Sequence, residues 1–497
     1  MGRLASSLNY WIFYPFFKFI NRVFIITPNT EKKKKIKRIT LTFLFKILAF
    51  VISTKPASRN NTIMSATALS KHNFKTHMNI FYWFSYKGLN FHQSEHLKTI
   101  LRDLKGEFEP YHSDKEHLKE ALQWLLRAQQ ATSDAGFSAG YTFFHDWLPS
   151  YPETTGYIIQ TLWDAYQMLK DEALKISALQ AADWLINIRL ENGATRAGFY
   201  GEDRSRFWSD TIVPAAFNTG QVILGWNQTF LETQEERYLN ASIKASHYLT
   251  ECISEEGIFE KGLSPGPTST LRSYYTRVAF ALIWTGILTN NPDFISAGRR
   301  HLDWSLSQQQ ENGWFSHASF HAHMPPYTHT LAYTAEGLFY SGVLLQEPSY
   351  IQAALKLVVA CQHVCERRGF FLPARLDKNF KSMDTFSCLT GNAQFAILWL
   401  KLGHYTQDLT LINTGLKMVE WLKRVQSLKS KNLGIRGGIA GDWPIFGSYS
   451  AFRYLNWATK FSADALMLSI KIKDNTYEKP LQSGSYRHVR HAAIAAV

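Results

Sequence analysis

The chain has 497 residues, of which 45% are hydrophobic and 14% aromatic, and it carries a formal net charge of +14. This composition is ample for one large packed core. The charge is uneven, because residues 1–110 hold 18 Lys and Arg against 5 Asp and Glu, whereas the remainder holds 36 against 35. Since the remainder is nearly neutral and the basic run adjoins apolar runs, the pattern argues against nucleic-acid binding.

Residues 1–110 form a basic, partly amphipathic N-terminal extension. Two apolar stretches, residues 10–26 and 39–53, flank the basic run 32–38 and are themselves interrupted by Lys and Arg. A membrane-spanning helix needs about 20 nearly uncharged residues, and neither stretch supplies them. We therefore expect residues 10–53 to bind an anionic membrane surface peripherally.

Two alternatives stand beside peripheral attachment. One is a short true membrane span, and the other is a true translation start at Met64 or Met78, so that residues 1–63 do not belong to the protein. The segment differs from a secretory signal peptide. Four cysteines, clustered in apolar segments, are too few for a disulfide framework and predict packed reduced thiols: Cys252, Cys361, Cys365 and Cys388. We therefore expect a cytoplasmic protein, bound at the inner face of the cytoplasmic membrane.

Six copies of a two-helix repeat fill residues 115–472. In each copy an apolar helix runs into a Gly-aromatic turn, as at Gly136-Phe137 and Gly313-Trp314, and a second apolar helix follows a longer loop. The starts of the second helices recur every 54 to 69 residues, at Thr155, Thr219, Thr276, Thr330, Thr390 and Thr459. Repeats of this length indicate stacked helical hairpins.

The two helices of each repeat differ in polarity. The second helices are apolar on all sides, as in residues 157–163 and 393–399, which predicts that they are completely buried. The first helices carry charge on one face and should face water. We therefore predict an all-α (α/α)6 toroid of six helical hairpins over residues 111–473, with a disordered tail at residues 474–497.

The loops of the two rims differ as well. Inner-to-outer connections are short and polar, whereas outer-to-inner connections are long and rich in aromatic, His and charged residues. Function usually lies on elaborate loops over a rigid scaffold, so we expect the site at the N-terminal ends of the inner helices. Those ends carry unpaired N–H groups and a partial positive charge, which favour an anionic or carbonyl ligand.

Four residues of these loops are candidates for proton transfer: Glu153, Asp210, His329 and Asp384. Glu153 precedes a buried helix, where its pKa would be raised, and with Asp210 it would make the two carboxyls of glycoside hydrolysis. His329 opens an inner helix as a general base or proton donor. In the alternative reading, Glu153 caps its helix and His329 is a packed imidazole. The four histidines of residues 317–329 lack a zinc spacing, so we expect neither metal nor cofactor.

A second set of residues is expected to bind substrate. Aromatic residues offer flat faces to sugar rings, and basic residues can hold acidic groups. The set comprises Tyr151, Tyr274, Tyr327, Trp443 and Trp457, the cations Arg277, Arg375 and Lys460, and the polar residues Asn392 and Asp442. Alternatively, most of these aromatics simply pack the loops.

These motifs resemble three groups of proteins. The aromatic-x-x-x-Gln-x-x-x-x-Gly-Trp run at residues 304–314 resembles the Gln-Trp repeats of terpenoid cyclases and prenyltransferase subunits. The six-hairpin count resembles the (α/α)6 glycoside hydrolases, lyases and sugar epimerases. Residues 388–402 (CLTGNAQ with IxWLxL) and 329–337 (HTLAYxxEG) are most similar to uncharacterised toroid proteins encoded among bacterial polysaccharide-biosynthesis genes. The resemblance covers residues 115–472 and implies the toroid fold.

The chemistry disfavours the first group. Terpenoid cyclases that protonate their substrate use an Asp-x-Asp-Asp cluster, and protein prenyltransferases hold zinc with Asp, Cys and His; this sequence has no equivalent of either. We therefore expect a carbohydrate-active protein that acts on a bacterial exopolysaccharide or its precursor as a hydrolase, lyase or uronyl epimerase. The alternative is a non-catalytic glycan-binding or assembly subunit that works with a polysaccharide synthase or transport partner.

Overall fold

The structure, a computed structural model, describes residues 94–201, 212–265 and 268–477. The N-terminal segment 10–53, Asp210 and tail residues 478–497 lie outside the described residues. The described helices are α4 (Ser94–Leu104), α5 (Asp114–Gln130), α6 (Pro152–Leu169), α7 (Glu172–Ile188), α8 (Ala216–Thr233), α9 (Glu236–Cys252), α10 (Thr276–Thr289), α11 (Pro292–Ser307), α12 (Thr328–Leu345), α13 (Pro348–Arg367), α14 (Leu389–Thr406), α15 (Leu409–Val425) and α16 (Asn456–Lys473), with a short 3-10 helix at Ser273–Tyr275.

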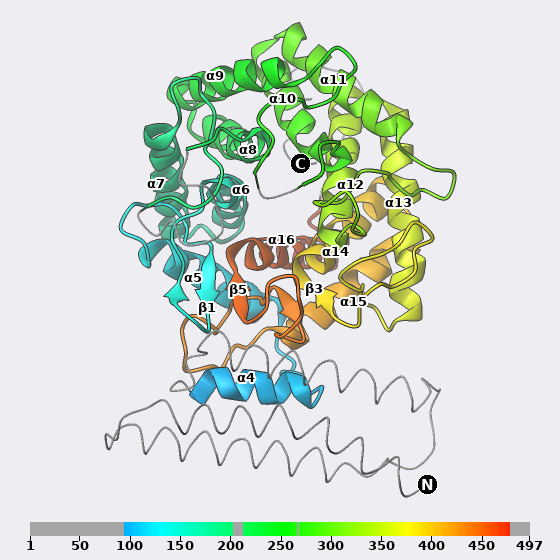
Figure 1. The fold of residues 1–497 in the computed structure, drawn as a ribbon. Helices are drawn as coiled ribbons and strands as arrows, with labels where there is room; N and C mark the ends of the chain where they lie inside the picture. Colours follow the sequence, from blue (N-terminus) through cyan, green and yellow to red (C-terminus); the bar gives the residue numbers. More distant parts are fainter. Residues whose placement is uncertain (1–93, 202–211, 266–267, 478–497) are drawn as a thin grey trace, which may run out of the picture. The chain divides into compact units, whose positions relative to one another are not determined.

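The even-numbered helices from α6 to α16 form an inner ring (Figure 1). Each packs against the next, and α16 returns to pack against α6. The odd-numbered helices α5 to α15 lie outside, each paired with one inner helix. The all-α (α/α)6 toroid predicted from the repeat is therefore confirmed.

The inner helices are buried along nearly their whole length, as their all-round apolar sequences predicted. Five of them end in the same way, on a residue with a left-handed backbone at φ between 52° and 61°: Lys170, Gln234, Asn290, Gln346 and Gln407. The N–H of each bonds to the carbonyl four residues earlier, which satisfies an otherwise unpaired carbonyl and turns the chain at once into the outer helix.

The Gly-aromatic turns set the spacing between neighbouring hairpins. Gly257 has φ 82° and Gly313 has φ 92°. A Cβ on Gly257 would lie 2.1 Å from the carbonyl oxygen of Arg300 in α11, and one on Gly313 would lie 2.8 Å from that of Lys356 in α13. Glycine is required here because the turn needs a positive φ and packs directly on the backbone of the next outer helix.

The first and last hairpins are joined through Asp114, at the start of α5. Its carboxylate accepts hydrogen bonds from Lys423 at 2.6 Å, from Lys473 at 2.7 Å and from Ser469 at 2.9 Å. Lys473 and Ser469 belong to α16, so this one carboxylate ties the beginning of the repeat to its end.

Small strands order the long loops at the N-terminal ends of the inner helices. Strand β1 (Gly140–Thr142) pairs antiparallel with β2 (Asp146–Trp147) and with β5 (Arg453–Leu455). Strand β3 (Ser387–Cys388) pairs antiparallel with β4 (Asp442–Trp443). The loop before α16 is therefore hydrogen-bonded to the loop before α6, through β5 and β1, and to the loop before α14, through β4 and β3.

Three smaller findings concern the remaining sequence predictions. All four cysteines are buried and unpaired. Within residues 94–201, 212–265 and 268–477, none of the helices has the length and apolar character needed to cross a membrane. Residues 474–477 still bond to the end of α16, for example through Tyr477 N–H to the carbonyl of Lys471 at 3.1 Å.

Candidate functional site

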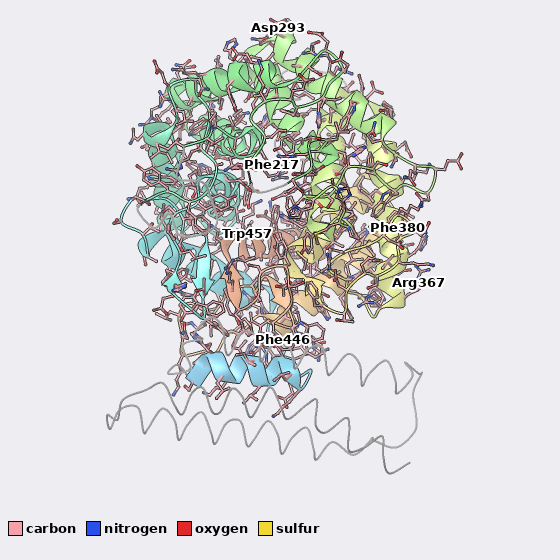
Figure 2. All side chains as sticks on the ribbon, in the orientation of Figure 1. Phe217, Asp293, Arg367, Phe380, Phe446 and Trp457 are labelled. Atoms are coloured by element: carbon pink, nitrogen blue, oxygen red, sulfur yellow. The ribbon has the colours of Figure 1, made fainter. Side chains whose placement is uncertain are left out.

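Six side chains converge where the inner helices begin, and we call them the mouth cluster: Tyr151, Glu153, His329, Tyr333, Tyr449 and Trp457. The rings of Tyr151 and Trp457 lie 6.2 Å apart, and the Trp457 indole N–H donates to the Tyr449 hydroxyl at 3.1 Å. The His329 ring lies 6.0 Å from Tyr449 and 4.4 Å from Tyr333. Figure 2 shows Trp457 and Phe217 on the inner side of the ring, whereas Asp293 lies at its outer edge.

Glu153 is the carboxylic acid of this cluster. It lies in the first turn of α6, directly after Pro152, and its side chain is partly exposed. Tyr151 donates its hydroxyl hydrogen to Glu153 Oε2 at 2.7 Å. Burial among aromatic side chains raises the pKa of Glu153 to about 7, and the Tyr151 hydrogen bond opposes that rise. Glu153 can therefore both donate and accept a proton near neutral pH.

Glu153 is not the N-cap of α6, because that position belongs to Tyr151, whose side chain makes no capping hydrogen bond. The pKa of Glu153 is nevertheless raised. Helix N-termini normally favour an ionised carboxylate, yet here the loss of water contact outweighs that effect.

His329, in the first turn of α12, is held in one orientation. Its Nδ1 lies 2.6 Å from the side-chain oxygen of Gln394 in α14. The Gln394 amide donates in turn to Glu336 Oε1 at 3.3 Å. Because the amide oxygen can only accept, His329 must carry its hydrogen on Nδ1, which leaves the lone pair on Nε2. Burial lowers the pKa of His329 to about 4, so the ring is neutral at physiological pH.

Arg277 reaches across the ring below the mouth cluster. It donates from Nη1 to Glu336 Oε2 at 2.5 Å and from Nε to Gln221 at 2.7 Å. The guanidinium also lies 5.3 to 6.0 Å from the centres of three rings, Tyr333, Phe461 and Tyr157. Burial is the largest effect on the pKa of Arg277 and lowers it, but the Glu336 carboxylate together with the hydroxyls of Tyr333, Tyr340 and Tyr157 outweighs burial, so the pKa of Arg277 is raised.

The other two predicted cations are paired as well. Lys460 contacts Asp464 at 2.6 Å, one turn further along α16. Arg375 grips Asp384 with two hydrogen bonds, of 2.8 and 2.7 Å, and lies 5.5 Å from the Tyr327 ring centre. Asp384 is thus part of an ion pair, and a substrate acid could reach these cations only by competing with their carboxylate partners.

Two of the predicted substrate-binding residues hold loops in place. Asn392 is buried and bonds to both the N–H and the carbonyl of Leu372, at 2.7 and 3.2 Å. Asp442 accepts from the backbone N–H groups of Ser450 at 2.6 Å and Tyr449 at 3.3 Å, and burial raises its pKa to about 8. Asp442 therefore positions the loop that carries Tyr449.

The remaining predicted aromatics pack against other rings. Trp443 stacks on Phe108 with ring centres 5.3 Å apart. Tyr274 is buried and lies 5.5 Å from Phe320. Tyr327 lies 4.9 Å from Tyr449, at the edge of the mouth cluster.

Sequence reasoning left Tyr333, Glu336 and Gln394 out of the site. A signal was available, because His329, Tyr333 and Glu336 are spaced i, i+4 and i+7 and so share one face of a helix. Gln394 stands in α14, and no local pattern places it beside α12. In the described part of the chain, no group of three His, Cys, Asp or Glu side chains is arranged to hold a metal ion.

Comparison with known proteins identifies the architecture. No family model and no curated protein sequence matches the chain. Solved structures do match: an unsaturated glucuronyl hydrolase specific for heparin has 15% identity and a TM-score of 0.57, covering 73% of this chain and 98% of its own. The unsaturated glucuronyl hydrolase of Bacillus sp. GL1, responsible for glycosaminoglycan degradation, has 13% identity and a TM-score of 0.57, covering 73% and 97%.

A cellobiose 2-epimerase from Bacillus thermoamylovorans has 10% identity and a TM-score of 0.54, covering 77% of this chain and all of its own. This chain shares their (α/α)6-toroid fold. At these identities the likeness concerns the fold, and the toroid supports different activities through the loops and side chains at its mouth.

Proposed function

We propose that this (α/α)6-toroid protein is a carbohydrate-active enzyme with Glu153 as its proton donor and acceptor. The observation that carries the proposal is the Glu153 carboxyl, which accepts a hydrogen bond from Tyr151 and whose pKa is raised by burial to about 7. Acid–base catalysis is most efficient when the pKa of the group lies near the working pH. The neighbours of the same fold include hydrolases and an epimerase that act on sugars.

The surroundings of Glu153 suit a sugar. Tyr151, Tyr327, Tyr449 and Trp457 provide aromatic faces at the entrance, and their hydroxyl and indole groups can hydrogen bond. Carbohydrate sites combine such flat apolar faces with a few fixed polar groups.

The pair of Glu153 and His329 favours proton transfer at a sugar carbon, as in a lyase or an epimerase. Both groups belong to the mouth cluster, and neutral His329 has its lone pair on Nε2. In this scheme, one group removes the proton next to a carbonyl or carboxylate. An epimerase returns a proton to the opposite face, whereas a lyase expels the leaving group. Direct hydrolysis requires a second carboxyl, for which Asp210 is the candidate.

The same proposal includes the biological setting expected from the sequence. The substrate would be a bacterial exopolysaccharide or its precursor. Residues 10–53 would hold the enzyme at the inner face of the cytoplasmic membrane, near a polysaccharide synthase or transport partner.

Proton NMR in heavy water of the full chain with uronate-containing and neutral oligosaccharides tests the proposal. New reducing ends indicate a hydrolase, a vinylic proton a lyase, and deuterium at the carbon next to the carboxylate or carbonyl an epimerase. The Glu153→Gln variant should abolish the change, and Glu255→Gln, which removes an exposed carboxyl elsewhere, should not. Saturable binding of an oligosaccharide that stays chemically unchanged would contradict the enzyme proposal and would indicate a non-catalytic glycan-binding subunit.

A further inference from the structure

The hydrogen-bonding groups around Glu153 in the mouth cluster are uncharged. Burial raises the pKa values of Tyr151, Tyr333 and Tyr449 well above their ordinary value of 10, so their phenol groups stay protonated at physiological pH. His329 is neutral, because burial lowers its pKa to about 4. Hydroxyl groups and a neutral imidazole suit the hydroxyl and carbonyl groups of an uncharged sugar.

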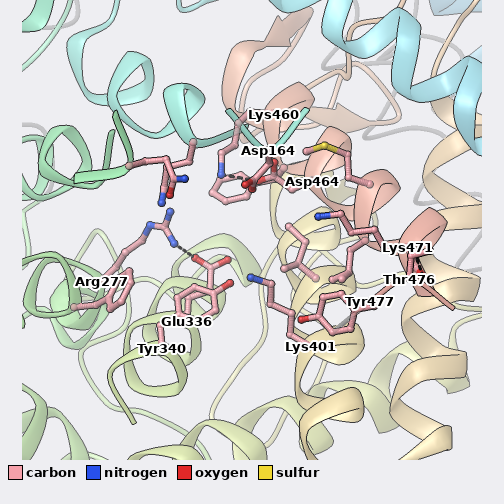
Figure 3. Close-up of a pocket in the computed structure, with 17 residues that line it drawn as sticks. Asp164, Arg277, Glu336, Tyr340, Lys401, Lys460, Asp464, Lys471, Thr476 and Tyr477 are labelled. Carbon is pink, nitrogen blue, oxygen red and sulfur yellow. Dashed lines mark hydrogen bonds and ion pairs between the residues drawn. The ribbon is translucent and has the colours of Figure 1, made fainter. Parts of the chain in front are cut away.

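Two of the three predicted substrate-binding cations line a different cavity. Arg277 and Lys460 belong to the wall of a cavity of about 320 Å³, which none of the six side chains of the mouth cluster lines (Figure 3). Both cations are paired there, Arg277 with Glu336 at 2.5 Å and Lys460 with Asp464 at 2.6 Å. The two ion pairs therefore present no net charge to a ligand at the mouth cluster.

The third cation, Arg375, lies at the edge of the mouth cluster. Its guanidinium is 5.5 Å from the centre of the Tyr327 ring, which lies 4.9 Å from the Tyr449 ring. Arg375 already donates two hydrogen bonds to Asp384, at 2.8 and 2.7 Å, and the Asp384 side chain is only 6% exposed. A substrate carboxylate would have to displace Asp384 and leave its charge buried without a partner, which is costly.

Glu153 would repel a substrate carboxylate. Burial raises its pKa, the hydrogen bond from Tyr151 lowers it, and within the described residues no cation adds to these two effects. The ionised form of Glu153 is therefore poorly shielded. Two negative charges about 6 to 10 Å apart, at an effective dielectric constant of about 20, repel strongly enough to lower affinity by about 10- to 100-fold.

The chemistry of proton removal favours the same class of substrate. Removal of a proton next to a carboxylate places a second negative charge on a group that already carries one, which calls for a cation or a metal ion beside it. Removal of a proton next to the carbonyl of an uncharged sugar places one negative charge on one oxygen. Uncharged donors such as tyrosine hydroxyls can stabilise that single charge.

We propose that the mouth cluster is a site for uncharged sugars with a free carbonyl group and that it discriminates against uronates. The chemical step rests on the proposed function. In the open-chain sugar, ionised Glu153 takes the proton from the carbon next to the carbonyl. The electron pair of the broken C–H bond forms a C=C bond, and the carbonyl oxygen gains the negative charge. Return of a proton to the opposite face restores the carbonyl and gives the epimer.

Matched pairs of disaccharides test the preference. Each pair contains a neutral disaccharide with a free reducing end and its counterpart in which C6 of the reducing-end sugar is oxidised to a carboxylate. Proton NMR in heavy water with the full chain measures deuterium exchange next to the carbonyl. We expect kcat/KM for the neutral member to be at least about tenfold higher. Equal or faster reaction of the uronate would overturn this inference and leave the proposed function intact.

Calorimetric titration of the same pairs separates binding from catalysis. At least about tenfold tighter binding of the neutral member supports the preference. If that binding occurs without any chemical change, the proposed function fails and the preference for uncharged sugars stands. If no neutral member binds or reacts, both the proposed function and this inference are overturned.

Two variants test the cause of the discrimination at pH 8, where Glu153 is mostly ionised. Glu153→Gln removes the repelling charge and should bind the uronate at least about tenfold more tightly. Asp384→Asn frees Arg375 and should also strengthen uronate binding. Glu255→Gln, which removes an exposed carboxyl elsewhere, is the matched control and should bind as the unaltered protein does. Unchanged uronate affinity in folded Glu153→Gln would overturn the proposal, even if Asp384→Asn failed to fold.

Discussion

Tyr151 donates its hydroxyl hydrogen to Glu153 Oε2 over 2.7 Å, at the point where the first long loop becomes helix α6. The two residues are only two positions apart, yet their environment comes from distant segments. Trp457 of α16 lies 6.2 Å from Tyr151, and the charge of Glu153 acts on the Tyr333 hydroxyl of α12. The surroundings of this contact therefore come from three helices of the inner ring, α6, α12 and α16.

Removal of the Glu153 carboxyl should stabilise the protein above neutral pH. Its folded pKa of about 7 lies above the ordinary value of 4.5, so the folded state binds the proton more tightly and stability falls as pH rises between these values. In urea unfolding at pH 8, Glu153→Gln should be more stable than the unaltered protein by about 1 to 3 kcal/mol, allowing for the partial exposure of the side chain. The advantage should vanish at pH 4. A constant difference at both pH values would exclude the raised pKa.

Loss of the Tyr151 hydroxyl should raise the pKa of Glu153 further. The hydrogen bond favours the ionised carboxylate, so Tyr151→Phe removes a stabilising contact worth about one pKa unit. Carbon-13 NMR titration of the Glu153 carboxyl measures the shift directly. Under the proposed function, the matching limb of the pH–rate profile should move upward by the same amount, and a profile that stays in place would remove Glu153 from the proton transfer.

The ion pair of Arg277 and Glu336 should be costly to break from one side. Both side chains are at most 4% exposed, so Glu336→Gln leaves a buried guanidinium without its countercharge. We expect a loss of about 3 to 5 kcal/mol in unfolding free energy. Replacement of both residues by Met should cost less than the sum of the single replacements, and additive losses in this double-mutant cycle would show that the two charges are independent.

Gln394 should determine which nitrogen of His329 carries the hydrogen. Nitrogen-15 NMR of labelled histidines should show His329 protonated on Nδ1 in the unaltered protein. Gln394→Leu removes the acceptor and should produce a mixture of both tautomers. Gln394→Glu keeps an acceptor and should preserve the Nδ1–H form. Gln362→Leu, at a buried glutamine far along α13, is the control and should leave the His329 signal unchanged.

Gly337 should tolerate no side chain. A Cβ at this position would lie 2.2 Å from the carbonyl carbon of Thr276, where α12 crosses the start of α10. Gly337→Ala should therefore cost about 3 kcal/mol or more, because the backbone of a neighbouring helix must move. Gly369→Ala offers a contrast: its φ is 81° but its Cβ would meet no atom within 4 Å, so only backbone strain of about 1 to 2 kcal/mol is expected. Similar unfolding midpoints for the two variants would contradict this account.

Much of the scaffold could be predicted because its causes are local. The recurring apolar helices, the Gly-aromatic turns and the polar connections each act within one repeat. Position Glu153 was predictable for the same reason, since it marks the start of an apolar helix after a long loop. The roles of Asn392 and Asp442 as supports for loops were not predictable. The partner of Asn392 lies 20 residues away in the chain, and the partner of Asp442 lies in a turn of irregular backbone.

The sequence by itself determined the number of hairpins, the division into inner and outer helices, and the rim that carries the long loops. These features follow from hydrophobic periodicity, which every repeat expresses separately. Only the tertiary structure decided which charges neutralise one another and which groups have shifted pKa values. Arg277 meets Glu336 across 59 positions, and His329 meets Gln394 across 65. Electrostatic environment depends on burial and on distances between segments remote in the chain, and the closed ring alone sets those distances.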